Sequence, residues 1–150
     1  MAEAKHVLVL HGPNLNLLGY REPDVYGKRT LADVDQLITT RCKELGAEVR
    51  ILQSNHEGQL IDALHEHRTW ASSIVINPGG LSHSSVSLRD AITAMRVPVI
   101  EVHVSNIYAR EEFRQISIIS PVCVGVISGF GAHGYVLAID AAVNMMESLL

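Results

Sequence analysis

Short apolar runs alternate with segments of helical periodicity along the whole chain. Residues 6–12 (HVLVLHG) form a β-branched, leucine-rich run that stops at a Gly-Pro pair, which is typical of a buried strand. In residues 30–47, apolar positions recur at helical spacing between a capping-box-like start at Thr30 and Asp33 and a closing Gly46. The pattern therefore predicts a strand followed by a helix.

The same alternation continues to the C-terminus. We expect strands at 48–54, 72–80, 98–105 and 121–129, helices at 57–70, 84–95 and 134–150, and a short helical turn at 110–114. Five β–α units in series predict a parallel sheet with helices on both faces, because right-handed crossovers leave few alternatives. We therefore expect a three-layer α/β sandwich with the flavodoxin-like strand order 2-1-3-4-5, since five units suit it better than a six-stranded dinucleotide-binding sheet.

Composition limits the class of protein. The 150 residues are 47% hydrophobic with a mean hydropathy of +0.18, which fits one domain spanning residues 1–150. No apolar run approaches the roughly 20 residues of a membrane span, and the start lacks a secretory pattern, so we expect a cytoplasmic protein with no membrane partner. Cys42 and Cys123 each lie in apolar periodic segments, which favours small buried residues over a redox or zinc site.

Charge points to a small ligand. The formal net charge of −4 argues against a nucleic-acid partner. Nine of the twelve basic residues are arginines, whose planar fork suits carboxylate or phosphate. An acidic protein with arginines in its loops favours a small anionic ligand over a polymer.

Polar residues gather where the expected strands end, which is where ligands bind in such sheets. They are Asn14, Asn16, Arg21 and Tyr26 after the first strand, Ser54, Asn55 and His56 after the second, Asn77 and His83 after the third, and Glu101, His103, Ser105, Asn106, Arg110 and Arg114 around the fourth. Asn16 is interpreted as a turn residue. Surface pairing of Arg21 with Glu22, or of the last two arginines with Glu111 and Glu112, is the alternative reading.

Glu101 and His103 are the polar residues hardest to explain by folding alone. Strand alternation places Ile100, Val102 and Val104 on one side and these two on the other. A central parallel strand has no solvated face, so both side chains must be satisfied by partners or by a ligand.

Two motifs are weaker than they look. GFGAHG (129–134) matches the dinucleotide fingerprint, but no later strand brings the acidic residue that the fingerprint needs, so we interpret it as a tight strand-to-helix turn. The histidines of HEH (65–67) are two apart on a helix and point in different directions, unlike an i, i+4 metal pair.

The remaining groups suit proton transfer without a cofactor. Tyrosine, with a usual pKa of about 10, becomes a base only if its phenolate is stabilised, as Arg21 or Arg110 would do for Tyr26. Histidine gives or takes a proton near neutrality, and an asparagine amide can stabilise an enolate. The set fits proton abstraction beside a carbonyl followed by loss of a protonated leaving group, which is a dehydration.

The chain resembles the type II 3-dehydroquinate dehydratases through long stretches in the expected order. They are LHGPNLNLLGYREPDVYG, QSNHEGQLIDALHE, INPGGLSHSSVSLRDAI, PVIEVHVSNIYAREEFR and GVISGFGAHGYVLAI. The resemblance implies a hydro-lyase that removes water from 3-dehydroquinate, giving 3-dehydroshikimate in the shikimate pathway of aromatic amino acid biosynthesis or in quinate catabolism. It also implies that neither a metal nor a cofactor takes part.

The same resemblance implies roles for individual residues. Tyr26 would take the C2 proton, Arg21 would stabilise its phenolate, and Asn14 would stabilise the enolate through a water. His103 would protonate the departing C1 hydroxyl, with Glu101 orienting it. Substrate would be bound by Asn77, His83, Arg114 and the backbone of Val104 and Ser105, while Arg110 closes over it and the loop 14–26 acts as a lid.

The resemblance further implies trimers assembled into a homododecamer, in which Asp90 reaches the site of a neighbouring subunit. The chain departs from the family at Leu81, where an aromatic residue is frequent, at Ser82 and Ser84, where threonines are frequent, and at Gln115, where a histidine is common. The competing hypothesis is a non-catalytic flavodoxin-like module that binds a nucleotide, a flavin or a partner. A receiver-type signalling domain is less consistent, because LHGPN offers no acidic residue to phosphorylate.

Overall fold

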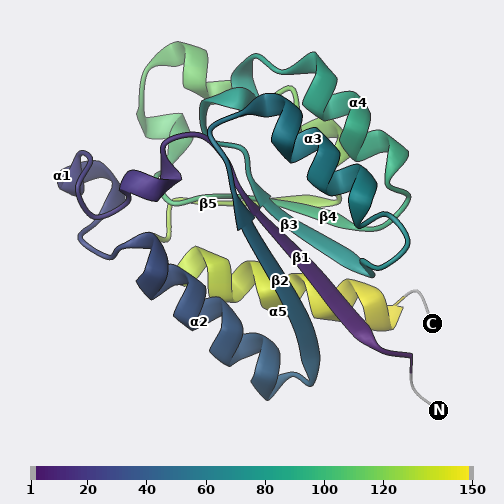
Figure 1. The fold of residues 1–150 in the computed structure, drawn as a ribbon. Helices are drawn as coiled ribbons and strands as arrows, with labels where there is room; N and C mark the ends of the chain where they lie inside the picture. The colour runs from purple at the N-terminus through teal and green to yellow at the C-terminus, as the bar shows by residue number, and fades with distance from the viewer. Residues whose placement is uncertain (1–2, 149–150) are drawn as a thin grey trace.

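The sheet is parallel throughout, and its strands lie in the order β2-β1-β3-β4-β5 (Figure 1). The computed structural model describes residues 3–148. Its strands are β1 (Lys5–His11), β2 (Ala47–Gln53), β3 (Ser73–Asn77), β4 (Val99–His103) and β5 (Gly125–Ser128). The predicted α/β class, strand number and flavodoxin-like order are confirmed.

Helices cover both faces of this sheet, with α2 (Leu31–Glu44) and α5 (His133–Ser148) on one face and α3 (Glu57–Glu66) and α4 (Val86–Ala94) on the other (Figure 1). The lone turn α1 (Pro23–Tyr26) projects from the loop between β1 and α2. Short 3₁₀ turns are η1 (Leu15–Leu17), η2 (Gly79–His83), η3 (Ile107–Ala109), η4 (Glu112–Gln115) and η5 (Ser120–Val122). Within residues 3–148, no helix has both the length and the hydropathy to cross a bilayer.

Strand alternation divides the core into two clusters. Val7, Val9 and Val102 belong to the cluster under α2 and α5, whereas Leu8 and Leu10 belong to the cluster under α3 and α4. Because both faces are covered, almost all of β1 and all of β3 and β4 are buried. The edge strands β2 and β5 are only partly buried, so the expected burial on both faces holds for the three central strands alone.

Three expected elements differ in detail. The strand expected at 121–129 begins only at Gly125, because Pro121 has no N–H for the ladder and lies in the turn η5. The helix expected at 57–70 ends at Glu66, where the chain turns through His67. The helix expected at 84–95 spans Val86–Ala94, and its first residue, Val86, is exposed, whereas Leu88 is buried. Residues 149–150 of the final expected helix lie outside the described residues.

The ends of β1 and β3 approach each other closely at Gly12. The Gly12 amide donates to the Asn77 carbonyl at 2.8 Å. A Cβ at Gly12 would lie 2.6 Å from the Pro78 carbonyl oxygen, a backbone atom with little freedom to move. The loop that follows β1 therefore begins at a position fixed by the end of β3.

Replacing Gly12 with alanine is expected to destabilise the fold by about 1–3 kcal/mol, because the added methyl overpacks two strand ends. The measurement is the urea midpoint of unfolding. Gly58→Ala in α3 is the matched control, since a Cβ there meets nothing within 4 Å and a helical Gly→Ala change favours the helix. Equal midpoints for Gly12→Ala and wild type would contradict the constraint.

Candidate active site

A cavity of about 200 Å³ opens at the carboxyl ends of β1, β3 and β4. Glu101 does not line it but lies fully buried behind His103, and Asp90 is exposed on α4 outside it. The other ten of the twelve residues to which the family resemblance gives a role do line the cavity. They are Asn14, Arg21, Tyr26, Asn77, His83, His103, Val104, Ser105, Arg110 and Arg114. Segments far apart in the chain thus meet in one small polar cavity.

The Tyr26 ring lies close to two guanidinium groups. The Arg21 guanidinium carbon is 4.9 Å from the ring centroid, and that of Arg110 is 5.1 Å from it. Both contacts place a positive charge over the electron-rich face of the ring, as in a cation–π interaction. Arg21 also lies 3.6 Å from the Glu22 carboxylate, so the expected surface pair forms alongside the tyrosine contact.

The segment that carries Tyr26 is anchored at its beginning and loosely packed at its end. Leu15 and Leu18 are buried in the core. Asn14 adopts a left-handed conformation with φ of 71°, and its backbone N–H donates to Oδ1 of the Asn55 side chain at 2.9 Å. Glu22 is also left-handed, with φ of 42°, and α1 contains no buried residue. Asn55 therefore helps to position Asn14.

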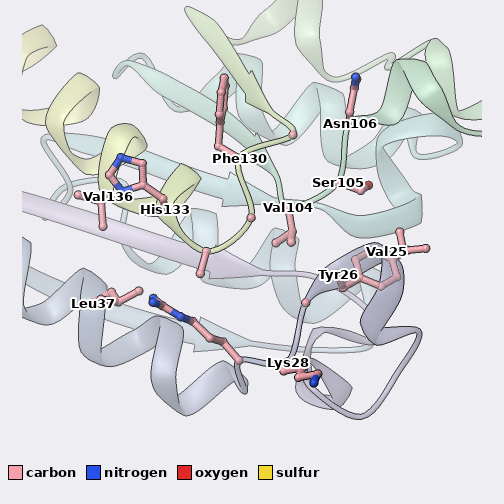
Figure 2. A pocket seen from close by; sticks show the side chains of 15 residues that line it. Val25, Tyr26, Lys28, Leu37, Val104, Ser105, Asn106, Phe130, His133 and Val136 are labelled. Atoms are coloured by element: carbon pink, nitrogen blue, oxygen red, sulfur yellow. The ribbon is translucent and has the colours of Figure 1, made fainter.

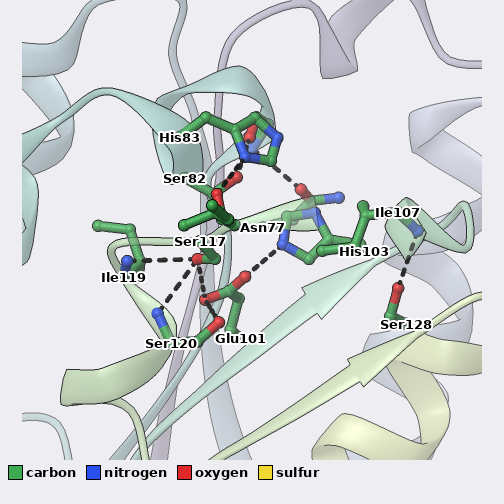
Figure 3. A network of polar contacts seen from close by, with 12 residues as sticks. Asn77, Ser82, His83, Glu101, His103, Ile107, Ser117, Ile119, Ser120 and Ser128 are labelled. Carbon is green, nitrogen blue, oxygen red and sulfur yellow. Dashed lines mark hydrogen bonds and ion pairs between the residues drawn. The ribbon is translucent and has the colours of Figure 1, made fainter. Parts of the chain in front are cut away.

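His103 and Glu101 form a buried pair on the α3/α4 face of β4. His103 Nε2 contacts Glu101 Oε2, and the hydroxyls of Ser117 and Ser120 donate to Glu101 Oε1 at 3.0 and 2.8 Å (Figure 3). Of the two expected ways to satisfy Glu101 and His103, partners or a ligand, the structure shows partners within the chain. The two serines were missed because no motif marks them, although a buried acid implies donors somewhere in the chain.

Asn77 is fixed at both ends of its amide. The Gly79 amide donates to Asn77 Oδ1 at 3.1 Å, which places the NH₂ group toward the Tyr135 hydroxyl at 2.7 Å. Burial raises the pKa of Tyr135, so this phenol stays neutral. Asn77 keeps one N–H and one lone pair of its oxygen for a ligand.

The remaining cavity groups come from the segments around η2, η3 and η4. His83 Nδ1 lies 2.8 Å from the Ile116 carbonyl oxygen. Arg110 donates to the Ser105 hydroxyl at 3.2 Å, and Arg114 donates to the Glu111 carboxylate at 2.6 Å. The arginine next to Glu111 lowers the pKa of that carboxyl. Both arginines line the cavity even though one has the expected surface partner.

The GFGAHG stretch forms a tight turn and borders a second cavity of about 660 Å³ (Figure 2). Gly129 and Gly131 have φ of 99° and 60°, and their amides donate to the carbonyls of His103 and Val104. A Cβ at Gly129 would lie 3.1 Å from the Asn106 Cβ. Both glycines adopt the left-handed conformation that the turn requires, and Gly129 also lets the chain pass close to the end of β4. This geometry supports the interpretation as a tight turn.

His11, the last residue of β1, is completely buried between α2 and α5. Its Nε2 lies 2.8 Å from Asp35 Oδ1, and its ring contacts the Tyr135 ring edge-on. Its Nδ1 is buried without a hydrogen-bond partner in the described structure. Across residues 3–148, no three His, Cys, Asp or Glu side chains are arranged to hold a metal ion.

Comparison with known proteins agrees with this geometry. A family profile described as "Dehydroquinase class II" matches residues 5–143. The 3-dehydroquinate dehydratase of Dictyoglomus turgidum is 60% identical over 90% of this chain and 93% of its own length, and that of Halothermothrix orenii is 53% identical over 94% and 95%. The crystal structure of type II dehydroquinase from Butyrivibrio crossotus superposes with a TM-score of 0.92 at 44% identity, covering 95% of this chain and 99% of that one. The chain belongs to the class II dehydroquinase family.

Proposed function

We propose that this chain is a 3-dehydroquinate dehydratase that eliminates water through an enolate, with Tyr26 as the base and His103 as the acid. The observation that carries the proposal is the cavity in which a phenol beside two guanidiniums faces the same space as an imidazole backed by a buried carboxylate. The family match favours this hypothesis over a non-catalytic binding module. The proposal takes residues 1–150 as one catalytic domain.

The first step is proton abstraction by Tyr26. Its phenolate takes the proton from C2, and the C–H electron pair moves to form an enolate with negative charge on the carbonyl oxygen at C3. Arg21 and Arg110 stabilise the phenolate before this transfer. Asn14, held by Asn55, stabilises the enolate oxygen through a water.

The second step is loss of the C1 hydroxyl. As the enolate collapses, a C1–C2 double bond forms, the C1–O bond breaks, and the hydroxyl leaves as water with a proton from His103. Because Nε2 of His103 is engaged by Glu101, the proton comes from Nδ1. The product is conjugated with the C3 carbonyl, and the step needs no further reactant.

The other cavity groups bind the substrate. Asn77 binds the substrate through the one N–H and the one oxygen lone pair that its contacts within the chain leave over. His83, Arg114 and the backbone of Val104 and Ser105 bind the substrate's hydroxyls and carboxylate. The carbonyls of Val104 and Ser105 accept from the Gly131 amide and the Ser128 hydroxyl, so this stretch of backbone is rigid. Arg110 closes over the ligand, and the loop 14–26 acts as the lid.

The assembly is proposed to be a trimer of the chain repeated in a dodecamer, with Asp90 completing the site of a neighbour. Support comes from the position of Asp90, which is exposed on α4 and does not line the cavity of its own chain. The cytoplasmic location inferred from the sequence stays a prediction.

Tyr26→Phe is expected to lower kcat/KM by roughly 10²–10⁴-fold, because removing a general base costs about this much. The assay follows the ultraviolet absorbance of the conjugated product after adding 3-dehydroquinate. Tyr108→Phe is the control, since Tyr108 is exposed and outside the cavity. A near-normal rate for Tyr26→Phe would remove Tyr26 from the role of base, and wild type without any signal would refute the activity.

Asp90 is tested by mixing variants. Asp90→Ala and Tyr26→Phe should each be impaired alone, but dissociating and reassembling them together should restore part of the activity. Mixed assemblies contain interfaces where an intact Tyr26 meets the intact Asp90 of a neighbour.

The control mixture is Tyr26→Phe with His103→Asn, which removes two groups of the same cavity and should not regain activity. Light scattering should give a mass well above that of one chain. A monomeric mass, or no recovery in the Asp90 mixture, would contradict the shared site.

A further inference from the structure

Glu101 is a buried carboxylate held by hydroxyl groups instead of a permanent cation. Its side chain is fully buried on the α3/α4 face of β4. In the described part of the chain no lysine or arginine pairs with it, and its partners are His103 on Oε2 and the hydroxyls of Ser117 and Ser120 on Oε1 (Figure 3). An ionised acid in such a place depends on these donors.

The Ser117 hydroxyl can donate only toward Glu101. Its oxygen accepts hydrogen bonds from the amides of Ile119 and Ser120 at 3.2 and 3.1 Å, which occupy both lone pairs. Its single proton is thereby directed to Glu101 Oε1, 3.0 Å away. The turn between η4 and η5 thus fixes one donor on the carboxylate. The Ser120 hydroxyl adds a second donor, and Glu101 is its only hydrogen-bond partner among the described residues.

The two O–H donors occupy both acceptor sites of Oε1, so Oε2 is the oxygen that remains for His103. Glu101 is thereby held in one orientation, with Oε2 on Nε2 of His103. Because Nε2 is engaged in this contact, Nδ1 is the ring nitrogen left to exchange a proton with a ligand.

We propose that Ser117 and Ser120 are positioning residues for the dehydration, because they hold Glu101 with its Oε2 aimed at His103. This inference rests on the proposed function of His103 as the acid. Neither serine lines the cavity, so both act through Glu101 and not on the substrate.

Other groups near the pair do not replace the serines. Burial raises the pKa of the Cys123 thiol to about 12, and the charge of Glu101 adds to this, so the thiol is neutral where the enzyme works. The titratable and charged groups that share the cavity with His103 are Arg21, Tyr26, His83, Arg110 and Arg114. All of them are unchanged in the variants below, so a change in kcat reports on the Glu101 pair.

Ser120→Ala is the principal test, since it removes only the bond to Glu101 and leaves the turn around Ser117 intact. Without this bond Glu101 can turn and its contact with Nε2 of His103 loosens, so kcat should fall about tenfold, as loss of one hydrogen bond to a charged group implies. KM should change little, because Ser120 does not line the cavity.

Ser117→Ala and the double variant should also lower kcat, the double variant most. Ser72→Ala is the matched control, because the Ser72 hydroxyl donates to the Ala4 carbonyl and accepts from the His6 backbone amide at the other end of the sheet. It should keep the wild-type kcat. Circular dichroism and the urea midpoint identify folded variants, and Ser120→Ala retains every backbone bond of the turn.

His103→Asn separates the two proposals. If His103→Asn is as active as wild type, the role of His103 fails and the role of the serines fails with it. If His103→Asn is inactive while folded Ser120→Ala keeps the wild-type kcat, only the role of the serines is overturned. A lower kcat with an unchanged KM supports that role.

Discussion

Coverage of both faces of the central strands is the constraint on which the rest of the structure depends. Helices lie over β1, β3 and β4 on each side, so a polar side chain on these strands is satisfied inside the protein or placed at a carboxyl end. Asn77 and His103 are the last residues of their strands, where the sheet opens. Glu101 lies deeper and relies on hydroxyl donors. The polar side chains that line or support the cavity are therefore those that the central strands cannot bury without partners.

The two faces of the sheet contribute different halves of the site. Asn77 is held from the α2/α5 face through Tyr135, whereas His103 and Glu101 are held from the other face by the segment between η4 and η5. Completely buried His11 ties β1 to Asp35 on α2, with one ring nitrogen left unpaired. An unpaired buried nitrogen costs on the order of 1–3 kcal/mol, which the surrounding packing offsets.

Tyr26 differs from these rigid groups because it stands on a turn without buried residues. Its ring is positioned by contacts with Arg21 and Arg110, and residues Asn14 and Glu22 in the same segment adopt left-handed conformations. A segment with little buried surface has low local stability, which is what a lid requires. The base is thus placed on a part of the chain that can open, and the acid on a strand that cannot.

The sequence by itself determined the α/β class, the strand order and most of the residues that line the cavity, because hydrophobic periodicity and the polar residues after each strand are local signals. It did not determine where β5 begins, since the turn η5 (Ser120–Val122) takes up the start of an apolar run that otherwise reads as strand. Only the tertiary structure decided that Ser117 and Ser120 meet Glu101 and that His11 meets Asp35. The positions of such hydrogen-bond partners follow no periodic pattern in the sequence. The carboxylate or the ring requires a partner only because the packing of the layers buries it away from water.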